Sequence, residues 1–204
     1  MSKSIGNVID PVAYIWEYSR DMLILYLFTA FPIWEDGDFS QEQAILSFNA
    51  KLSNNLWNLL NRAIALSLKL GGSINWDVWK VWNDKIERYI SLMNNNELKL
   101  SLEIAFEYAS EINKYVDENT PWKMNIEITW ESEKLENILF ILLSNLRKIA
   151  IMLCPFFHTK MNELLTRIGT PYDSSLSIVD NLLIDPVSFF IAEKGEPLYM
   201  RISK

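Results

Sequence analysis

The stretch QEQAILSFNAKLSNNLWNLLNRAIALSLKL, residues 41–70, decides the fold class of this chain. Its apolar side chains recur every three or four positions, which is the period of an amphipathic helix with one face against a core. Ser40, followed three residues later by Gln43, predicts a capping box at the start, and Gly71-Gly72 predicts the end. The pattern therefore predicts one long helix. The apolar positions that show it are Ile45, Phe48, Leu52, Leu56, Leu59, Leu60 and Ala63.

Segments with a similar period flank this helix on both sides. Asp10-Pro11 predicts the start of a short helix that continues to Ser19. Residues 21–30 are apolar nearly all round, and their methionine and leucine content favours a buried helix over a strand. After residue 70, helices are predicted over residues 77–93, 98–118 and 131–153, and a shorter one over 160–168 beyond a break at Pro155.

The last thirty or so residues show no clear period but are rich in apolar side chains. A free tail would be polar, so this composition predicts a tail that packs back on the helices. The predicted fold is mainly α, an antiparallel helical bundle preceded by a loop and a small connecting module. We expect residues 1–40 to form the loop and connecting module, and residues 41–204 to form the bundle with its tail.

Composition favours a folded protein in a reducing compartment. Half of the 204 residues are hydrophobic, and there are few chain breakers, with Gly 6 and Pro 7. The only cysteine, Cys154, lies in the apolar run 149–157, which favours a buried thiol over a reactive one. No basic-then-apolar leader opens the chain, and charges interrupt the apolar stretches before the ~20 residues that a bilayer requires. We expect a soluble, cytoplasmic protein that does not enter a membrane.

The formal net charge of −7 limits how the chain could bind a nucleic acid. Affinity for phosphates that does not depend on sequence comes from Lys and Arg that release counterions, so the composition alone argues against a nucleic-acid partner, RNA included, and we expect no DNA partner. An RNA ligand would have to be bound through a local patch, with its bases stacked and hydrogen-bonded, as in readers of single-stranded RNA.

Short motifs spread over the chain resemble those of one family. They are Met1-Ser2-Lys3-Ser4-Ile5-Gly6-Asn7-Val8-Ile9-Asp10-Pro11, Asp36-Gly37-Asp38-Phe39-Ser40, Asn58-Leu59-Leu60-Asn61-Arg62, Asn113-Lys114-Tyr115-Val116-Asp117-Glu118, Thr120-Pro121-Trp122, Cys154-Pro155-Phe156 and Gly195-Glu196-Pro197-Leu198-Tyr199-Met200-Arg201-Ile202. In order and spacing they resemble the methionyl-tRNA synthetases, beginning inside the KMSKS loop of these class I enzymes. The pair Pro121-Trp122 separates this family from the isoleucine, valine, leucine and cysteine synthetases, which share the loop.

The sequence departs from the family pattern at two positions. Ile24 stands where the family often has arginine, and Met200 replaces the usual proline near the end. The first change removes a salt link between the loop and the bundle, so whether the connecting module packs in the usual way stays open.

The resemblance implies a methionine–tRNA ligase, which attaches methionine to its tRNA through a methionyl-adenylate. The full enzyme would use ATP, methionine and Mg2+, and the loop lysine that approaches the phosphates would be Lys3. The sequence contains neither a Gly-rich βαβ unit nor an H-I-G-H-like element. We therefore expect this piece to be inactive alone, to bind no cofactor, and to have as partners the methionine tRNA and an N-terminal catalytic domain outside it.

The resemblance also assigns anticodon contacts to four residues. Asn58 and Arg62 would donate hydrogen bonds to base edges, and Trp122, presented by Pro121, would be a stacking platform for an unstacked base. Without the resemblance, the stripe of Asn54, Asn58 and Arg62 would be interpreted as a solvated helix face, and Trp122 as core packing.

The remaining chemical groups predict no catalytic or metal site. His158 is the only histidine, so a His-rich metal site is not expected, and no Ser/His/Asp or Cys/His catalytic arrangement can be assembled reliably from the sequence. Asp36 and Asp38 fit turn and cap chemistry. Two alternatives stay open: a non-catalytic helical module that binds RNA or protein, and a different class I synthetase, which a buried Trp122 would favour.

Overall fold

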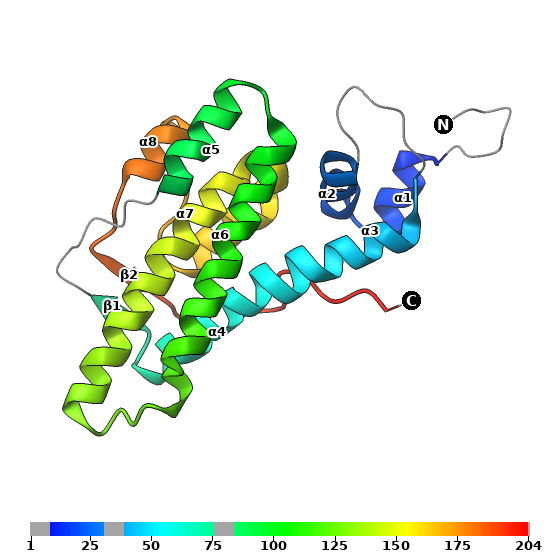
Figure 1. Cartoon of the computed structure of the whole chain (residues 1–204). Helices are drawn as coiled ribbons and strands as arrows, with labels where there is room; N and C mark the ends of the chain where they lie inside the picture. The colour runs from blue at the N-terminus through cyan, green and yellow to red at the C-terminus, as the bar shows by residue number, and fades with distance from the viewer. Residues whose placement is uncertain (1–8, 31–38, 76–83, 204) are drawn as a thin grey trace, which may run out of the picture.

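The computed structural model describes residues 9–30, 39–75 and 84–203, and this part of the chain is mainly helical (Figure 1). The fold class predicted from the sequence is confirmed. Helices α5, α6 and α7 run alternately up and down, with α6 in contact with both of the others. The elements in order are α1 Pro11–Glu17, α2 Arg20–Ala30, α3 Gln41–Phe48, η2 Asn49–Trp57, α4 Asn58–Lys69, β1 Ser73–Asn75, α5 Asp84–Asn94, α6 Leu98–Asn119, η3 Pro121–Lys123, α7 Thr129–Arg167, α8 Ile178–Leu183 and β2 Ser188–Phe190.

The predicted long helix is present, but its middle third is π-helical. The regular turns of α3 pass without a break into η2 and then into α4. At the start, Ser40 Oγ accepts a hydrogen bond from the Gln43 N–H at 3.3 Å. The Ser40 N–H donates to the Tyr26 hydroxyl at 2.9 Å, so Tyr26 takes the place that Gln43 would have in a complete capping box.

The glycine pair after α4 does more than stop the helix. Gly71 and Gly72 both have positive φ, at 89° and 82°. A Cβ atom on Gly72 would lie 2.3 Å from the carbonyl oxygen of Ile191, and the Gly72 carbonyl accepts a hydrogen bond from the Ile191 N–H at 2.8 Å. Only glycine allows this close approach, which brings the chain after α4 against the tail.

The break predicted at Pro155 lies at Phe157, inside α7. Phe157 has φ −125° and ψ 47°, so two helical stretches meet there at a kink, as a proline two residues earlier would cause. Helix α7 as a whole is long and apolar enough to cross a membrane, contrary to the expectation from the sequence. However, 89% of its most apolar window is buried inside the protein, which is the behaviour of a core helix.

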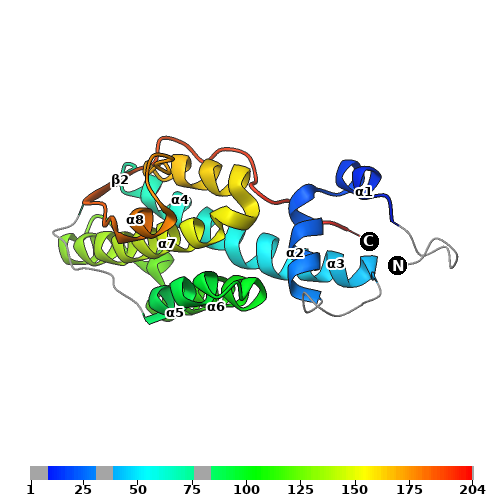
Figure 2. The ribbon, with the colours of Figure 1, turned by 90° about the horizontal axis from the view of Figure 1, so that it is seen from above.

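The tail packs on the bundle through elements that the sequence did not predict. Strand β2 pairs antiparallel with β1, with Ile74 opposite Phe189, and α8 lies against α7 (Figure 2). Two buried cations on α7 hold this region. Arg147 donates to the carbonyls of Asn181 and Ile184 at 2.8 and 2.9 Å, and Lys148 forms an ion pair with Asp185 at 2.7 Å.

Helices α1 and α2 share one apolar core with the bundle. Met22 and Leu25 on α2 are fully buried, and Ile24 is partly buried against the same core. Tyr199 in the tail donates a hydrogen bond to Asp21 at 2.7 Å. The predicted boundary at residue 40 between connecting module and bundle stays a prediction, because one continuous apolar core contains residues from both sides of it.

Candidate functional site

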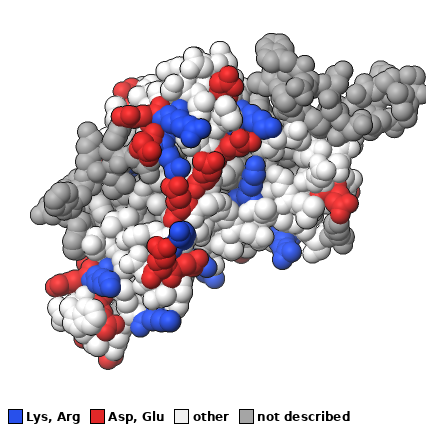
Figure 3. All heavy atoms as spheres, in the orientation of Figure 1, with Lys and Arg blue, Asp and Glu red and all other residues white. Residues whose placement is uncertain are grey.

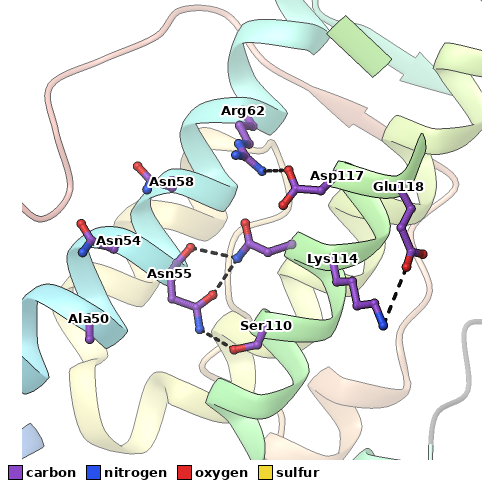
Figure 4. A pocket seen from close by; sticks show the side chains of 10 residues that line it. Ala50, Asn54, Asn55, Asn58, Arg62, Ser110, Lys114, Asp117 and Glu118 are labelled. Atoms are coloured by element: carbon purple, nitrogen blue, oxygen red, sulfur yellow. Dashed lines mark hydrogen bonds and ion pairs between the residues drawn. The ribbon is translucent and has the colours of Figure 1, made fainter. Parts of the chain in front are cut away.

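A groove runs between the long helix and α6 and has a volume of about 770 Å3. One wall consists of Asn54, Asn58 and Arg62, and the other includes Lys114 and Asp117 from α6 (Figure 4). Asn54 and Asn58 are exposed, with their side chains open to solvent. The groove therefore presents amide and guanidinium groups, which can donate hydrogen bonds, and amide oxygens, which can accept them.

The π-helical segment explains why these side chains line one wall. In a regular α-helix a step of four residues advances about 40° around the axis, so Ala50 and Arg62, three such steps apart, would lie about 120° apart. A π-helix has more than four residues in each turn, so the same step turns back. Ala50, Asn54, Asn58 and Arg62 consequently all line the groove.

Arg62 connects the groove to Trp122. Its Nη1 atom lies 2.8 Å from Oδ1 of Asp117, in an ion pair between partly exposed side chains. The Arg62 guanidinium carbon also lies 5.7 Å from the centre of the Trp122 ring, within the range of a cation–π contact. These two contacts fix the guanidinium at the end of the groove, beside the indole.

The backbone after α6 presents Trp122 to solvent. Helix α6 ends at Asn119, and Thr120 follows in the left-handed conformation with φ 42°. Pro121 then begins the short helix η3 and is buried, whereas Trp122 is 47% exposed. A buried Trp122 would have favoured a different class I synthetase. Because the indole is exposed, that alternative is not favoured, and Trp122 is not a core residue.

The charges that line the groove occur in pairs. Lys114 and Glu118 lie 3.8 Å apart on α6, and Arg62 is paired with Asp117. On the molecular face of Figure 3, Lys and Arg side chains are interspersed with Asp and Glu. A ligand would accordingly be held more by hydrogen bonds and stacking than by a basic surface, as the net charge of −7 predicts.

The structure adds residues that the sequence did not indicate. Asn55, Ser110 and Asn113 form a hydrogen-bonded cluster between η2 and α6 at the base of the groove (Figure 4). One signal for this cluster was present in the sequence, because Asn113 begins one of the family-like motifs. Its partner Asn55 is 58 residues away, so no local pattern connects the two.

The other candidate groups lie elsewhere. Lys3, Asp36 and Asp38 are outside the described residues. His158 is exposed, and its Nε2 lies 3.0 Å from Asn162 Nδ2. Burial raises the pKa of the Cys154 thiol to about 12, in agreement with an inert cysteine. The described ranges contain no group of three or more His, Cys, Asp and Glu side chains that could hold a metal ion.

Comparisons with known proteins indicate the family of this chain. Residues 1–64 match the family model described as tRNA synthetases class I (M). The methionine–tRNA ligase of Bacillus subtilis is 32% identical over 99% of this chain, and that of Rickettsia conorii is 31% identical over 86% of it. The chain covers 32% and 37% of these two proteins, so it spans about a third of the length of such relatives.

Solved structures show the same fold. The structure of Mycobacterium tuberculosis methionyl-tRNA synthetase bound by methionyl-adenylate has a TM-score of 0.84 to this chain, at 21% identity, covering 98% of this chain and 41% of that one. The apo form of the same enzyme gives a TM-score of 0.83. By its sequence, the chain belongs to the methionyl-tRNA synthetase family.

Proposed function

We propose that the groove between η2, α4 and α6 binds the anticodon of a methionine tRNA, as part of a methionine–tRNA ligase. The observation that carries the proposal is the juxtaposition of Arg62 with the exposed ring of Trp122, at the end of a wall lined by Asn54 and Asn58. Hydrogen-bonding groups beside an exposed aromatic ring are what a reader of unstacked RNA bases requires.

Each residue has a distinct part in this proposal. Trp122 stacks on one anticodon base, and buried Pro121 fixes the direction of the indole. Asn58 and Arg62 donate hydrogen bonds to the edges of that base or its neighbour. The ion pair with Asp117 orients the Arg62 fork before RNA binds, which reduces the conformational entropy lost on binding.

The remaining steps of the ligase reaction belong to the whole protein. The family uses ATP, methionine and Mg2+ to form methionyl-adenylate, and Lys3 would be the loop lysine that approaches the phosphates as pyrophosphate leaves. We propose that residues 1–40 form this loop and a connecting module, and that the enzyme works in the cytoplasm with a catalytic domain outside the described residues.

The test is a titration of the chain with two anticodon stem-loops, one bearing CAU and one with a changed first base. Trp122→Ala should weaken binding of the CAU loop by about tenfold or more, because stacking a base on an aromatic ring contributes about 1–3 kcal/mol. Since the groove charges are paired, the salt dependence of binding should be shallow.

Trp16→Ala is the matched control. Trp16 is 86% exposed but lies on α1, at the opposite end of the molecule from the α6–α7 loop that carries Trp122 (Figure 1). Its removal should leave binding unchanged, and circular dichroism should show equal helicity for all three proteins. If the wild type binds both loops equally, or folded Trp122→Ala keeps full discrimination, the anticodon assignment fails and a non-catalytic interaction module is the better account.

A further inference from the structure

A polar cluster joins the π-helical segment to α6 at the base of the groove. Asn113 Nδ2 lies 2.6 Å from Oδ1 of Asn55 and 3.2 Å from the backbone carbonyl oxygen of Asn55. Asn55 Nδ2 in turn donates to Ser110 Oγ at 2.9 Å and to the Phe106 carbonyl at 3.3 Å. Each of these bonds crosses between η2 and α6, and Asn113 also reaches the Ala109 carbonyl of its own helix at 3.1 Å.

The bond to the Asn55 carbonyl bears directly on helix register. At the end of η2 the backbone changes from hydrogen bonds five residues apart to the α-helical pattern, and the Asn58 N–H bonds to the Asn55 carbonyl, only three residues back. A carbonyl oxygen has two lone pairs and can accept a second hydrogen bond beside this one. The side-chain amide of Asn113 supplies one.

We infer that Asn55, Ser110 and Asn113 act as a clamp that holds the π-helical register of residues 49–57, and thereby keeps Asn54, Asn58 and Arg62 on one wall of the groove. Asn113 is the central positioning residue, because it bonds both the side chain and the backbone of Asn55. The inference rests on the proposed function for its consequence in RNA binding. Under this inference, discrimination between one RNA base and another depends on the clamp residues, which need not touch the RNA.

A shift of register would move the groove residues without unfolding the protein. In a regular α-helix, each step of four residues rotates a side chain by about 40° around the helix axis. If η2 relaxed to that form, Asn54 would therefore turn away from Arg62. The apolar face, with Leu52, Leu56 and Leu59 fully buried, opposes complete unwinding. Loss of the clamp should consequently change recognition more than stability.

The experiment compares variants of the 204-residue chain in the two-stem-loop titration. Asn113→Leu keeps the approximate size of the side chain but removes the donor, and Asn113→Asp places a carboxylate against two acceptor oxygens of Asn55. Both should reduce the preference for the CAU loop by about tenfold, the effect expected when well-placed base contacts are lost.

Asn95→Leu is the control for loss of an asparagine bond. Asn95 follows α5 and donates to the Ser91 carbonyl four residues earlier at 3.0 Å, a local bond like that from Asn113 to Ala109. This variant should leave the preference between loops unchanged. Hydrogen exchange provides a readout that does not need RNA: amides of residues 49–57 should exchange faster in Asn113→Leu, while the amides of α7 stay as protected as in the wild type.

The outcomes separate the clamp from the proposed function. A wild type that discriminates between the loops, with Asn113→Leu discriminating equally well, overturns the clamp and leaves the anticodon assignment standing. A wild type that binds both loops alike removes the anticodon assignment, and exchange over residues 49–57 then decides the clamp alone. Unchanged exchange there, or equal acceleration over α7, shows that Asn113 does not hold this register.

Discussion

Replacing Gly72 by alanine tests the contact between the end of α4 and the tail. Gly72 has φ 82°, and a Cβ atom there would lie 2.3 Å from the backbone oxygen of Ile191. Gly71 has nearly the same φ, 89°, but a Cβ atom there would meet nothing within 4 Å. The two glycines thus form a matched pair that separates backbone strain from steric overlap.

The expected magnitudes follow from these two terms. An L-residue in the left-handed region costs roughly 1–2 kcal/mol, which is the whole cost for Gly71→Ala. Gly72→Ala adds an overlap with backbone, which cannot move aside as a flexible side chain can, and forced overpacking typically costs about 1–3 kcal/mol. The hydrogen bond from the Ile191 N–H to the Gly72 carbonyl, now 2.8 Å, would also be displaced. We expect Gly72→Ala to destabilise the protein by about 2–5 kcal/mol in total.

Urea unfolding followed by circular dichroism measures both variants against the wild type. With a slope of about 2–3 kcal/mol per molar urea, the extra ~1–3 kcal/mol should place the midpoint of Gly72→Ala about 0.3–1.5 M below that of Gly71→Ala. Equal midpoints for the two variants would refute the reasoning, because they would mean that position 72 carries no close approach to the tail. A changed slope for Gly72→Ala alone would show instead that the tail detaches before the bundle unfolds.

Three further results are expected. The thiol of Cys154, whose pKa burial raises to about 12, should react with a thiol reagent at pH 8 only after denaturant is added; rapid labelling of the native protein would contradict its burial. Burial raises the pKa of Asp21 despite the hydrogen bond from Tyr199, so the folded state holds this proton more tightly than the unfolded chain, and the associated stability is lost as pH rises through the folded pKa. Asp21→Asn should therefore gain in urea midpoint relative to the wild type as the pH rises above about 4, and a constant difference would argue against the raised pKa. Finally, the chain alone should catalyse no methionine-dependent exchange between ATP and pyrophosphate, and exchange above the buffer blank would disprove this.

The sequence alone determined most of the helices and pointed to part of the candidate site. The apolar period of residues 41–70, the cap at Ser40 and the start at Asp10-Pro11 are local signals, and the structure has a helix or cap at each. The family-like motifs indicated Asn58, Arg62 and Trp122, and the structure places the first two in one groove and the third beside Arg62.

Only the tertiary structure decided how these parts meet. The π-helical segment at residues 49–57 is hydrogen-bonded to Asn113 on α6, and the β1–β2 pair joins strands that begin at residues 73 and 188. Trp122 is exposed because a left-handed Thr120 and a buried Pro121 turn the chain outward, although an indole in a sequence more often predicts core. The physical reason is separation along the chain: helical periodicity comes from neighbours three or four residues apart, whereas the groove is held by bonds between residues more than fifty positions apart.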